Sequence, residues 1–349
     1  MGTLLTIVLA LLVFGFLIFI HEFGHYLFAR IFKVKINEFS IGMGPKLMSY
    51  KSKKTGINYA LSMLPIGGYV AMAGEDDESD DPNSFDKKPA WQRLIITAAG
   101  AAVNLIVGFI VMTLLITITP IGSTTVAEFY TKEESGFEIS SAESGLKEGD
   151  VIIAIDGKKV SILDELSYEI MRRGTKPLDI TVIRDGSPIT VPDVVFPGMT
   201  EEGQSFGTMD FKVFRAERSF GNLMNHAMRR SFLTVRMCWE SIYDLLTGRY
   251  TMEAVSGPVG ISSAIGDAAR QGVASLLHIT ALISINLGVM NLLPIPALDG
   301  GRIITILAEM VSRKRLPKKV EGMINAVGLA LLLLLSLVIM VKDVVKLII

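Results

Sequence analysis

Residues 14–32 read FGFLIFIHEFGHYLFARIF and place His21, Glu22 and His25 inside a run that is otherwise apolar and aromatic. The whole chain has only 4 histidines, so the segment holds an unusual share of them. On a helix the two imidazoles leave the same face one turn apart and can converge on a single Zn²⁺ ion. Glu22 lies beside that face, where it can take a proton from a water that the metal activates.

The alternative is that these three side chains only form hydrogen bonds within a helical core, because HExxH recurs by chance. The surrounding sequence argues against it. Ionisable groups within a membrane-length apolar segment are costly and are functional sites by default. The pattern therefore favours a metal site.

The composition predicts an integral membrane protein. Of 349 residues 50% are hydrophobic, and the mean hydropathy is +0.46, which is too apolar for a soluble domain. A net charge of -1 argues against a nucleic-acid partner, and the single cysteine, Cys238, excludes an intramolecular disulfide.

Four apolar segments are long enough to cross a bilayer core, which needs about 20 residues. They cover residues 4–31, 94–118, 273–293 and 322–341. Lys and Arg are abundant in residues 26–93 and 302–319 and absent from residues 1–20. By the positive-inside rule the basic segments are cytoplasmic, which predicts that both termini and residues 119–272 lie outside.

Residues 57–72, INYALSMLPIGGYVAM, are apolar and β-prone but broken by Pro65, Gly67 and Gly68. We expect a re-entrant or membrane-surface β-hairpin whose backbone is covered by other protein. Its edge strand either pairs with an extended peptide substrate or is an ordinary interfacial strand. The acidic stretch that follows, Glu75–Asp86, is interpreted as a solvated loop.

In the second apolar segment Gly100, Ala101 and Ala102 form a small-residue face that is predicted to pack against another helix. Asn104 is the residue whose polar side chain is costlier to place in an apolar span. It either orients a group of the active site or bridges to a neighbouring helix, and both interpretations remain open.

Residues 123–198 have the composition of a soluble α+β domain. We expect strands at 151–155, 178–184 and 189–195 and a helix at 163–173. This pattern resembles a PDZ domain of the permuted bacterial protease type. The resemblance implies that the domain binds or size-filters extracytoplasmic peptide segments. A spacer without a ligand is the alternative.

Residues 199–272 are predicted to form an extracytoplasmic region with an amphipathic helix within 217–255. Arg236, Glu240 and Asp244 recur every fourth residue, which favours a helix in the outer interface or packed over the membrane domain. The chain then breaks at Gly257–Gly260 before the third span.

Residues 286–302, NLGVMNLLPIPALDGGR, contain the candidate third metal ligand. A catalytic zinc ion takes three protein ligands and keeps an open position. The predicted topology puts both His21 and Asp299 near the cytoplasmic ends of inward-running spans, whereas His226 and His278 fall on the outer side. The alternative is that Asp299 caps a helix over 300–311.

Asn291 precedes Pro294 by one helical turn. Its amide either donates to a substrate carbonyl and its oxyanion or satisfies the carbonyls that Pro294 frees.

HEFGH in the first span, NLLPIPALDGG at the third, GGYV between spans and the PDZ-like insert together resemble the site-2 protease family of intramembrane zinc metalloproteases. The resemblance covers nearly the whole chain and is strongest to the bacterial regulator-of-sigma-E type, here with a single PDZ domain. The second-span motif of relatives is commonly Gly-Pro-x-x-Asn, whereas this chain has Ala101 in place of the proline. A proline kink is therefore not expected there.

The resemblance implies a polytopic α-helical membrane protein of the bacterial cytoplasmic membrane with an inserted extracytoplasmic PDZ-like domain and an active site toward the cytoplasm. The implied domains are residues 1–118, 123–198, 199–272 and 273–349. The implied substrates are single-span membrane proteins such as anti-sigma factors or remnant signal peptides, cut within or near the bilayer. A membrane zinc transporter or sensor and a catalytically silent PDZ-bearing scaffold are the rival hypotheses.

The implied site has Zn²⁺ bound by two histidines and an aspartate, with a glutamate as catalytic base. Candidates for substrate or oxyanion binding come from the second and third spans and from the predicted hairpin. The metal ligands are His21, His25 and Asp299, the base is Glu22, and the further candidates are Asn291, Pro294, Gly67, Gly68 and Asn104.

Overall fold

A computed structural model describes residues 3–75, 78–137, 140–201, 204–249 and 255–348. The chain forms two compact units, one from residues 1–111 and 234–349 and the other from residues 112–233. The boundaries between the two units fall within two helices, α2 (Ala90–Ile118) and α5 (Phe220–Leu246).

The first unit is built mainly from helices. Its elements, including those shared with the second unit, are α1 (Thr3–Ile31), β1 (Ile36–Lys51), β2 (Asn58–Met72), the 3-10 turn η1 (Phe85–Lys87), α2 (Ala90–Ile118), α5 (Phe220–Leu246), α6 (Pro258–Gln271), α7 (Val273–Asn291), α8 (Asp299–Ser312) and α9 (Lys318–Ile348).

The described residues contain 4 helices long and apolar enough to cross a membrane: Thr6–Ile31, Ala90–Ile118, Val273–Asn291 and Lys318–Val345. They agree with the expected spans, and the chain is an integral membrane protein. In α9 only 6% of the most apolar window is buried within the protein, so its side chains face outward, as lipid contact requires.

Glycines allow α2 to approach its neighbours closely. A Cβ on Gly24 of α1 would lie 2.5 Å from the Ala99 carbonyl oxygen of α2, and a Cβ on Gly108 of α2 would lie 2.5 Å from Ile285 of α7. Small residues at such crossings let backbones touch where lipid-like side chains would hold them apart. Of the predicted small-residue face, Gly100 and Ala101 lie at such contacts, with α1 and α7, whereas Ala102 is exposed.

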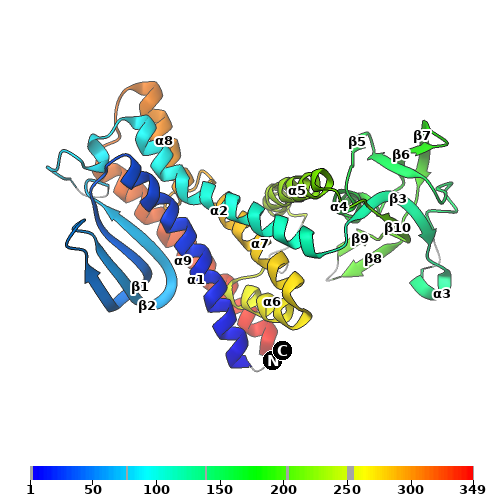
Figure 1. The fold of residues 1–349 in the computed structure, drawn as a ribbon, viewed down its shortest axis with the longest axis horizontal. Coiled ribbons are helices and arrows are strands. Elements are labelled where there is room, and N and C mark those ends of the chain that lie inside the picture. The colour runs from blue at the N-terminus through cyan, green and yellow to red at the C-terminus, as the bar shows by residue number, and fades with distance from the viewer. Residues whose placement is uncertain (1–2, 76–77, 138–139, 202–203, 250–254, 349) are drawn as a thin grey trace. The chain divides into compact units, whose positions relative to one another are not determined.

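The sheet of β1 and β2 lies beside α1 (Figure 1) and differs from the expected hairpin. The two ends of β2 do not pair with each other. They flank the first half of β1: Phe39 pairs with Tyr59 on one side and with Val70 on the other. The expectation missed β1 as the central strand, because its second half, from Met43 onward, carries mixed polar residues without a clear alternation.

The acidic stretch is more than a solvated loop. Asp81 accepts from Lys35 at 2.8 Å, Asp86 lies 3.5 Å from Lys318, and Glu75 pairs with Arg302. Residues 76–77 lie outside the described part of the chain. Basic side chains from distant positions thus hold this loop against the helical unit.

The second unit contains an α+β domain. Its elements are β3 (Gly122–Phe129), α3 (Lys132–Ser135), β4 (Val151–Ile155), β5 (Lys158–Lys159), α4 (Leu163–Arg173), β6 (Leu178–Arg184), β7 (Ser187–Val194), β8 (Gly198–Glu201), β9 (Gln204–Gly207) and β10 (Phe211–Arg215).

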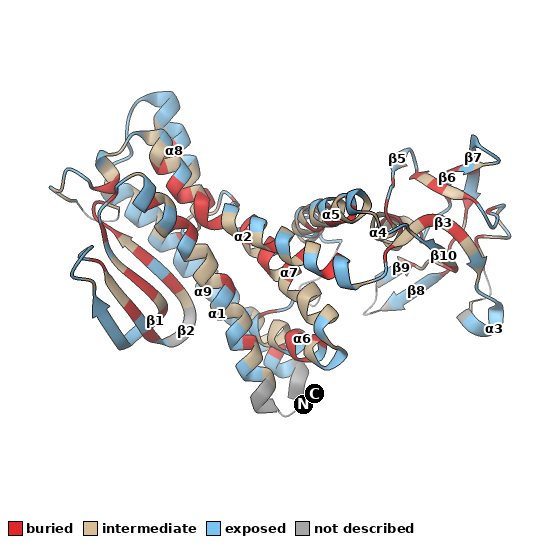
Figure 2. Ribbon diagram, in the orientation of Figure 1, coloured by how far each residue is buried: buried red, intermediate tan, exposed pale blue. Residues whose placement is uncertain are grey.

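Its main sheet has the order β10-β3-β4-β6-β7, with β5 paired to β4. The helix and strands expected between 151 and 195 are all present. The boundary expected at residue 198 is too early, because Phe211–Arg215 forms an edge strand antiparallel to β3 and Phe211 is fully buried in the core. Figure 2 shows the buried part of β3 and the exposed α3.

An ion pair between the buried Asp150 and the half-buried Arg184 fixes this domain internally. Asp150 accepts two hydrogen bonds from the Arg184 guanidinium, each 2.7 Å long. Burial alone would raise the pKa of the Asp150 carboxyl, but these bonds and the Lys147 N–H outweigh it and leave the pKa below its usual value. The carboxylate is therefore charged at neutral pH.

The amphipathic helix expected within 217–255 is α5, in which Arg236 donates to Glu240 at 2.8 Å. Residues 250–254 lie outside the described part. The expected break at Gly257–Gly260 is instead the start of α6, with Pro258 in its first turn. The Asp343 carboxylate accepts from the Gly257 and Gly260 N–H groups at 2.9 and 3.0 Å, which explains why a helix begins there.

Candidate metal centre

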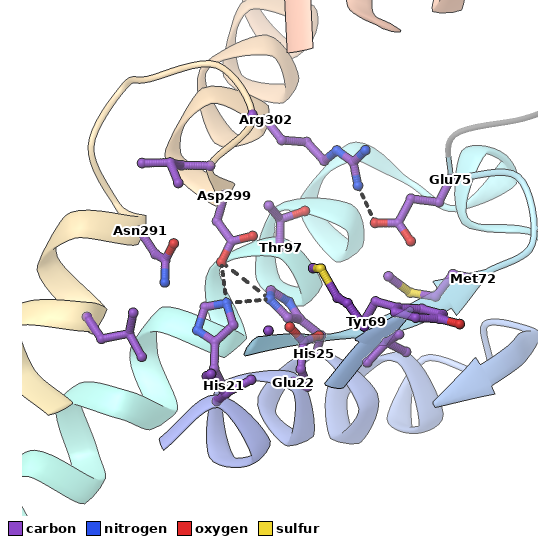
Figure 3. A pocket seen from close by; sticks show the side chains of 18 residues that line it. His21, Glu22, His25, Tyr69, Met72, Glu75, Thr97, Asn291, Asp299 and Arg302 are labelled. Atoms are coloured by element: carbon purple, nitrogen blue, oxygen red, sulfur yellow. Dashed lines mark hydrogen bonds and ion pairs between the residues drawn. The ribbon is translucent and has the colours of Figure 1, made fainter. Parts of the chain in front are cut away.

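His21 and His25 leave α1 on the same face, as their spacing predicts. Their rings meet edge to face with centroids 4.9 Å apart, and the two Nε2 atoms are 3.3 Å apart (Figure 3). Nδ1 of His25 donates to the Ile96 carbonyl of α2 at 2.9 Å. This bond leaves Nε2 of His25 without a proton and turned toward His21 when the ring is neutral.

Asp299, the first residue of α8, lies next to these two rings although it is far from them in the sequence. The helix α7 ends at Asn291, and α8 begins at Asp299 after a short turn. The turn is tight: a Cβ on Gly300 would lie 2.0 Å from the Leu293 carbonyl oxygen, so only glycine fits there.

The Asp299 carboxylate points at the imidazoles rather than capping α8. Its Oδ2 is 3.2 Å from Nε2 of His21 and 3.3 Å from Nε2 of His25 (Figure 3). The residue before the helix is Leu298, and its side chain makes no capping bond. The geometry thus favours the ligand interpretation of Asp299 over the capping one.

The three donor atoms fit a tetrahedral zinc site. Zinc binds imidazole nitrogen and carboxylate oxygen at about 2.0–2.2 Å, which for a tetrahedron gives ligand-to-ligand distances of about 3.3–3.6 Å. The observed separations of 3.3, 3.2 and 3.3 Å lie at this edge length. Among the described residues, this is the one group of His, Cys, Asp or Glu side chains close enough to share a metal ion.

Glu22 lies outside this ligand group but lines the same cavity. Gly68 of β2 packs against it, since a Cβ there would be 2.9 Å from Glu22 Cγ. Any side chain at position 68 would push the carboxylate aside. The glycine predicted in the hairpin therefore has a specific role beside the candidate base.

The cavity around the ligands measures about 420 Å³ and is bounded by α1, β1, β2, α2, α7 and α8. Of the predicted residues, Gly67, Gly68 and Asn291 line it together with the metal ligands. Pro294 is not part of its wall, although Ala297 and Leu298 of the same turn between α7 and α8 are. Asn104 is also outside the wall. It contacts Nδ1 of His21, the ring nitrogen that does not face Asp299.

Polar residues that the sequence did not single out also line the cavity (Figure 3): Thr97, Tyr69, Glu75 and Arg302. Tyr69 donates its hydroxyl to Glu38 at 2.5 Å, and this bond raises the pKa of Tyr69 above its usual value. The hydroxyl proton of Tyr69 is thus used in the hydrogen bond to Glu38. Arg302 could have been noticed in the sequence, since it lies three residues after Asp299 and one helical turn places both on one face.

The comparisons with known proteins agree with this site. The model of peptidase family M50 matches residues 9–335. A Clostridium acetobutylicum protein whose name assigns it to the zinc metalloproteases is 34% identical over 339 residues, covering 97% of both chains. The zinc metalloprotease RasP of Geobacillus kaustophilus is 28% identical, covering 99% of both chains. The regulator of sigma-W protease RasP of Bacillus subtilis is 27% identical, covering 98% of this chain and 99% of the relative.

An integral membrane protein with two histidines, an aspartate and a glutamate around one cavity has the donor set of a zinc metalloprotease. The chain belongs to peptidase family M50.

Proposed function

We propose that this chain hydrolyses peptide bonds within or near the transmembrane segment of single-span proteins, at a zinc ion held by His21, His25 and Asp299. The observation that carries the proposal is the set of separations between the three donor atoms, 3.2 to 3.3 Å, inside a membrane-spanning unit. A bound zinc ion would acidify the attacking water and polarise the scissile carbonyl.

Glu22 would act as the general base and then as the general acid. Its carboxylate lines the cavity next to the ligands without belonging to them. It would accept a proton from the attacking water and donate it to the leaving amine. Asn291 has an amide in the same cavity that makes no hydrogen bond within the described part of the chain, so it can donate to the carbonyl oxygen as negative charge develops.

The substrate would bind as an extended strand. The stretch Gly68–Met72 of β2 pairs with β1 on one side, and its residues line the cavity on the other. A helical carbonyl is already hydrogen-bonded, so a membrane helix must unwind before water can attack. Strand addition to β2 would hold the unwound segment with main-chain hydrogen bonds next to Glu22.

The Bacillus subtilis relative is named as a regulator of sigma-W protease. By analogy, we propose membrane-bound regulators such as anti-sigma factors as substrates of this chain, and remnant signal peptides as a second group. The α+β domain would act as the single PDZ domain and select peptide segments outside the membrane.

Cleavage can be tested with purified protein and a single-span substrate in detergent or lipid nanodiscs. We expect a cut inside the substrate's apolar segment, mapped by mass spectrometry, that stops when 1,10-phenanthroline removes the metal and returns when zinc is added. Cleavage that persists after metal removal, or a cut only in soluble flanks, would refute the proposal.

The proposed topology has the α+β domain outside and the α8–α9 connection in the cytoplasm. In a chain with Cys238→Ala, a Lys158→Cys variant should react with a membrane-impermeant maleimide on intact cells. The matched Lys314→Cys variant should react only after lysis. The reverse pattern would invert the orientation.

A further inference from the structure

Asn104 of α2 lies directly behind one metal ligand. Its side chain is fully buried, and its Nδ2 lies 3.3 Å from Nδ1 of His21. Its own backbone carbonyl accepts from the Ser284 hydroxyl of α7 at 2.8 Å, which anchors this turn of α2. The amide oxygen Oδ1 is buried and has no partner in the described part of the chain.

Both rings are held through the nitrogen that points away from the cluster. Nε2 of His21 faces Asp299 Oδ2, 3.2 Å away, and His25 Nε2, 3.3 Å away. Nδ1 of His25 donates to the fixed carbonyl of Ile96. Nδ1 of His21 has the side-chain amide of Asn104 in the corresponding place.

A ring that binds metal through Nε2 carries its proton on Nδ1 and needs an acceptor there. In the orientation described above, Asn104 would present a second donor to that proton across 3.3 Å. A half-turn of the amide about its Cβ–Cγ axis exchanges Nδ2 for Oδ1 and turns the contact into an Nδ1–H to Oδ1 hydrogen bond. The same half-turn gives the unpartnered oxygen a partner.

We propose that Asn104 is a positioning residue that orients His21 for metal binding, its amide oxygen accepting from Nδ1–H when Nε2 is turned to the metal. An amide suits this position because it carries both a donor and an acceptor without charge. The inference rests on the proposed metal site. It assigns Asn104 to the ligand rather than to the substrate, in agreement with its place outside the cavity wall.

Two substitutions separate hydrogen bonding from packing. Asn104→Leu removes donor and acceptor at similar volume, and we expect zinc to bind about 10- to 100-fold more weakly. Asn104→Asp keeps an acceptor for Nδ1–H, and we expect zinc affinity at least as high as in the wild type. Affinity is measured on the whole protein in detergent by competition with a chromophoric chelator, and the ligand geometry by the visible absorption of the Co²⁺ form.

At saturating zinc, Asn104→Leu should lower kcat and leave KM unchanged, because Asn104 does not line the cavity. Equal zinc affinity in Asn104→Leu and the wild type would overturn the proposal. So would equal losses in the Leu and Asp variants, which would indicate packing alone. The metal site is tested separately by His21→Ala: if that variant keeps its zinc, the proposed site is wrong whatever Asn104 does.

Discussion

Glu22→Gln is expected to lower kcat for cleavage of a single-span substrate by about 10²- to 10⁴-fold, the usual contribution of a general base. Glutamine has the same shape and fits beside Gly68, where the backbone of β2 leaves little room. It cannot take a proton from water at neutral pH. Cleavage is measured with purified variants under single-turnover conditions, so that slow product release does not hide the chemical step.

Zinc content distinguishes this effect from loss of the site. Glu22 is not one of the three clustered ligands, so the Gln variant should keep its zinc. The matched variant Asp299→Asn weakens a ligand and should lose both zinc and activity. If Glu22→Gln cleaves as fast as the wild type, Glu22 is not the base.

Gly100→Ala is expected to weaken zinc binding by about 10-fold or more, although position 100 holds no ligand. A Cβ there would lie 2.3 Å from Nε2 of His25, the atom that faces Asp299. The ring cannot turn away freely, because its Nδ1 is tied to the Ile96 carbonyl of the same helix α2. Either the imidazole shifts off the metal or α1 and α2 separate. Zinc affinity and cleavage should fall together.

Gly108→Ala is the matched control on the same helix. Its added Cβ would lie 2.5 Å from Cγ1 of Ile285, a side chain outside the cavity. We expect this variant to lower the melting temperature in detergent while keeping wild-type zinc affinity. If Gly100→Ala keeps the zinc affinity of the wild type, the contact between α1 and α2 at position 100 has more room than the structure indicates.

Local patterns predicted the elements of this fold well. The four apolar segments gave helices with bounds close to those expected, and the region from 151 to 195 gave its strands and helix in place. These features depend on composition and periodicity within one segment, which a single sequence contains in full. The helix α6 was missed because its start depends on Asp343, a residue far along the chain.

Long-range pairing was the main source of error. The central position of β1 and the edge position of β10 depend on which strands meet, and alternation within a strand does not specify its partner. The sequence predicts a solvated acidic loop because the ion-pair partners of that loop, Lys35, Arg302 and Lys318, come from separate parts of the sequence.

For the site, the sequence by itself determined the ligand types, because His21 and His25 share a helical face through spacing alone and an aspartate follows the broken third span. Only the tertiary structure decided that Asp299 turns toward the imidazoles instead of capping α8, and that Asn104 lies behind His21 rather than in the cavity. The physical reason is that both outcomes depend on how closely α1, α2, α7 and α8 pack, and glycines at their contacts set those distances.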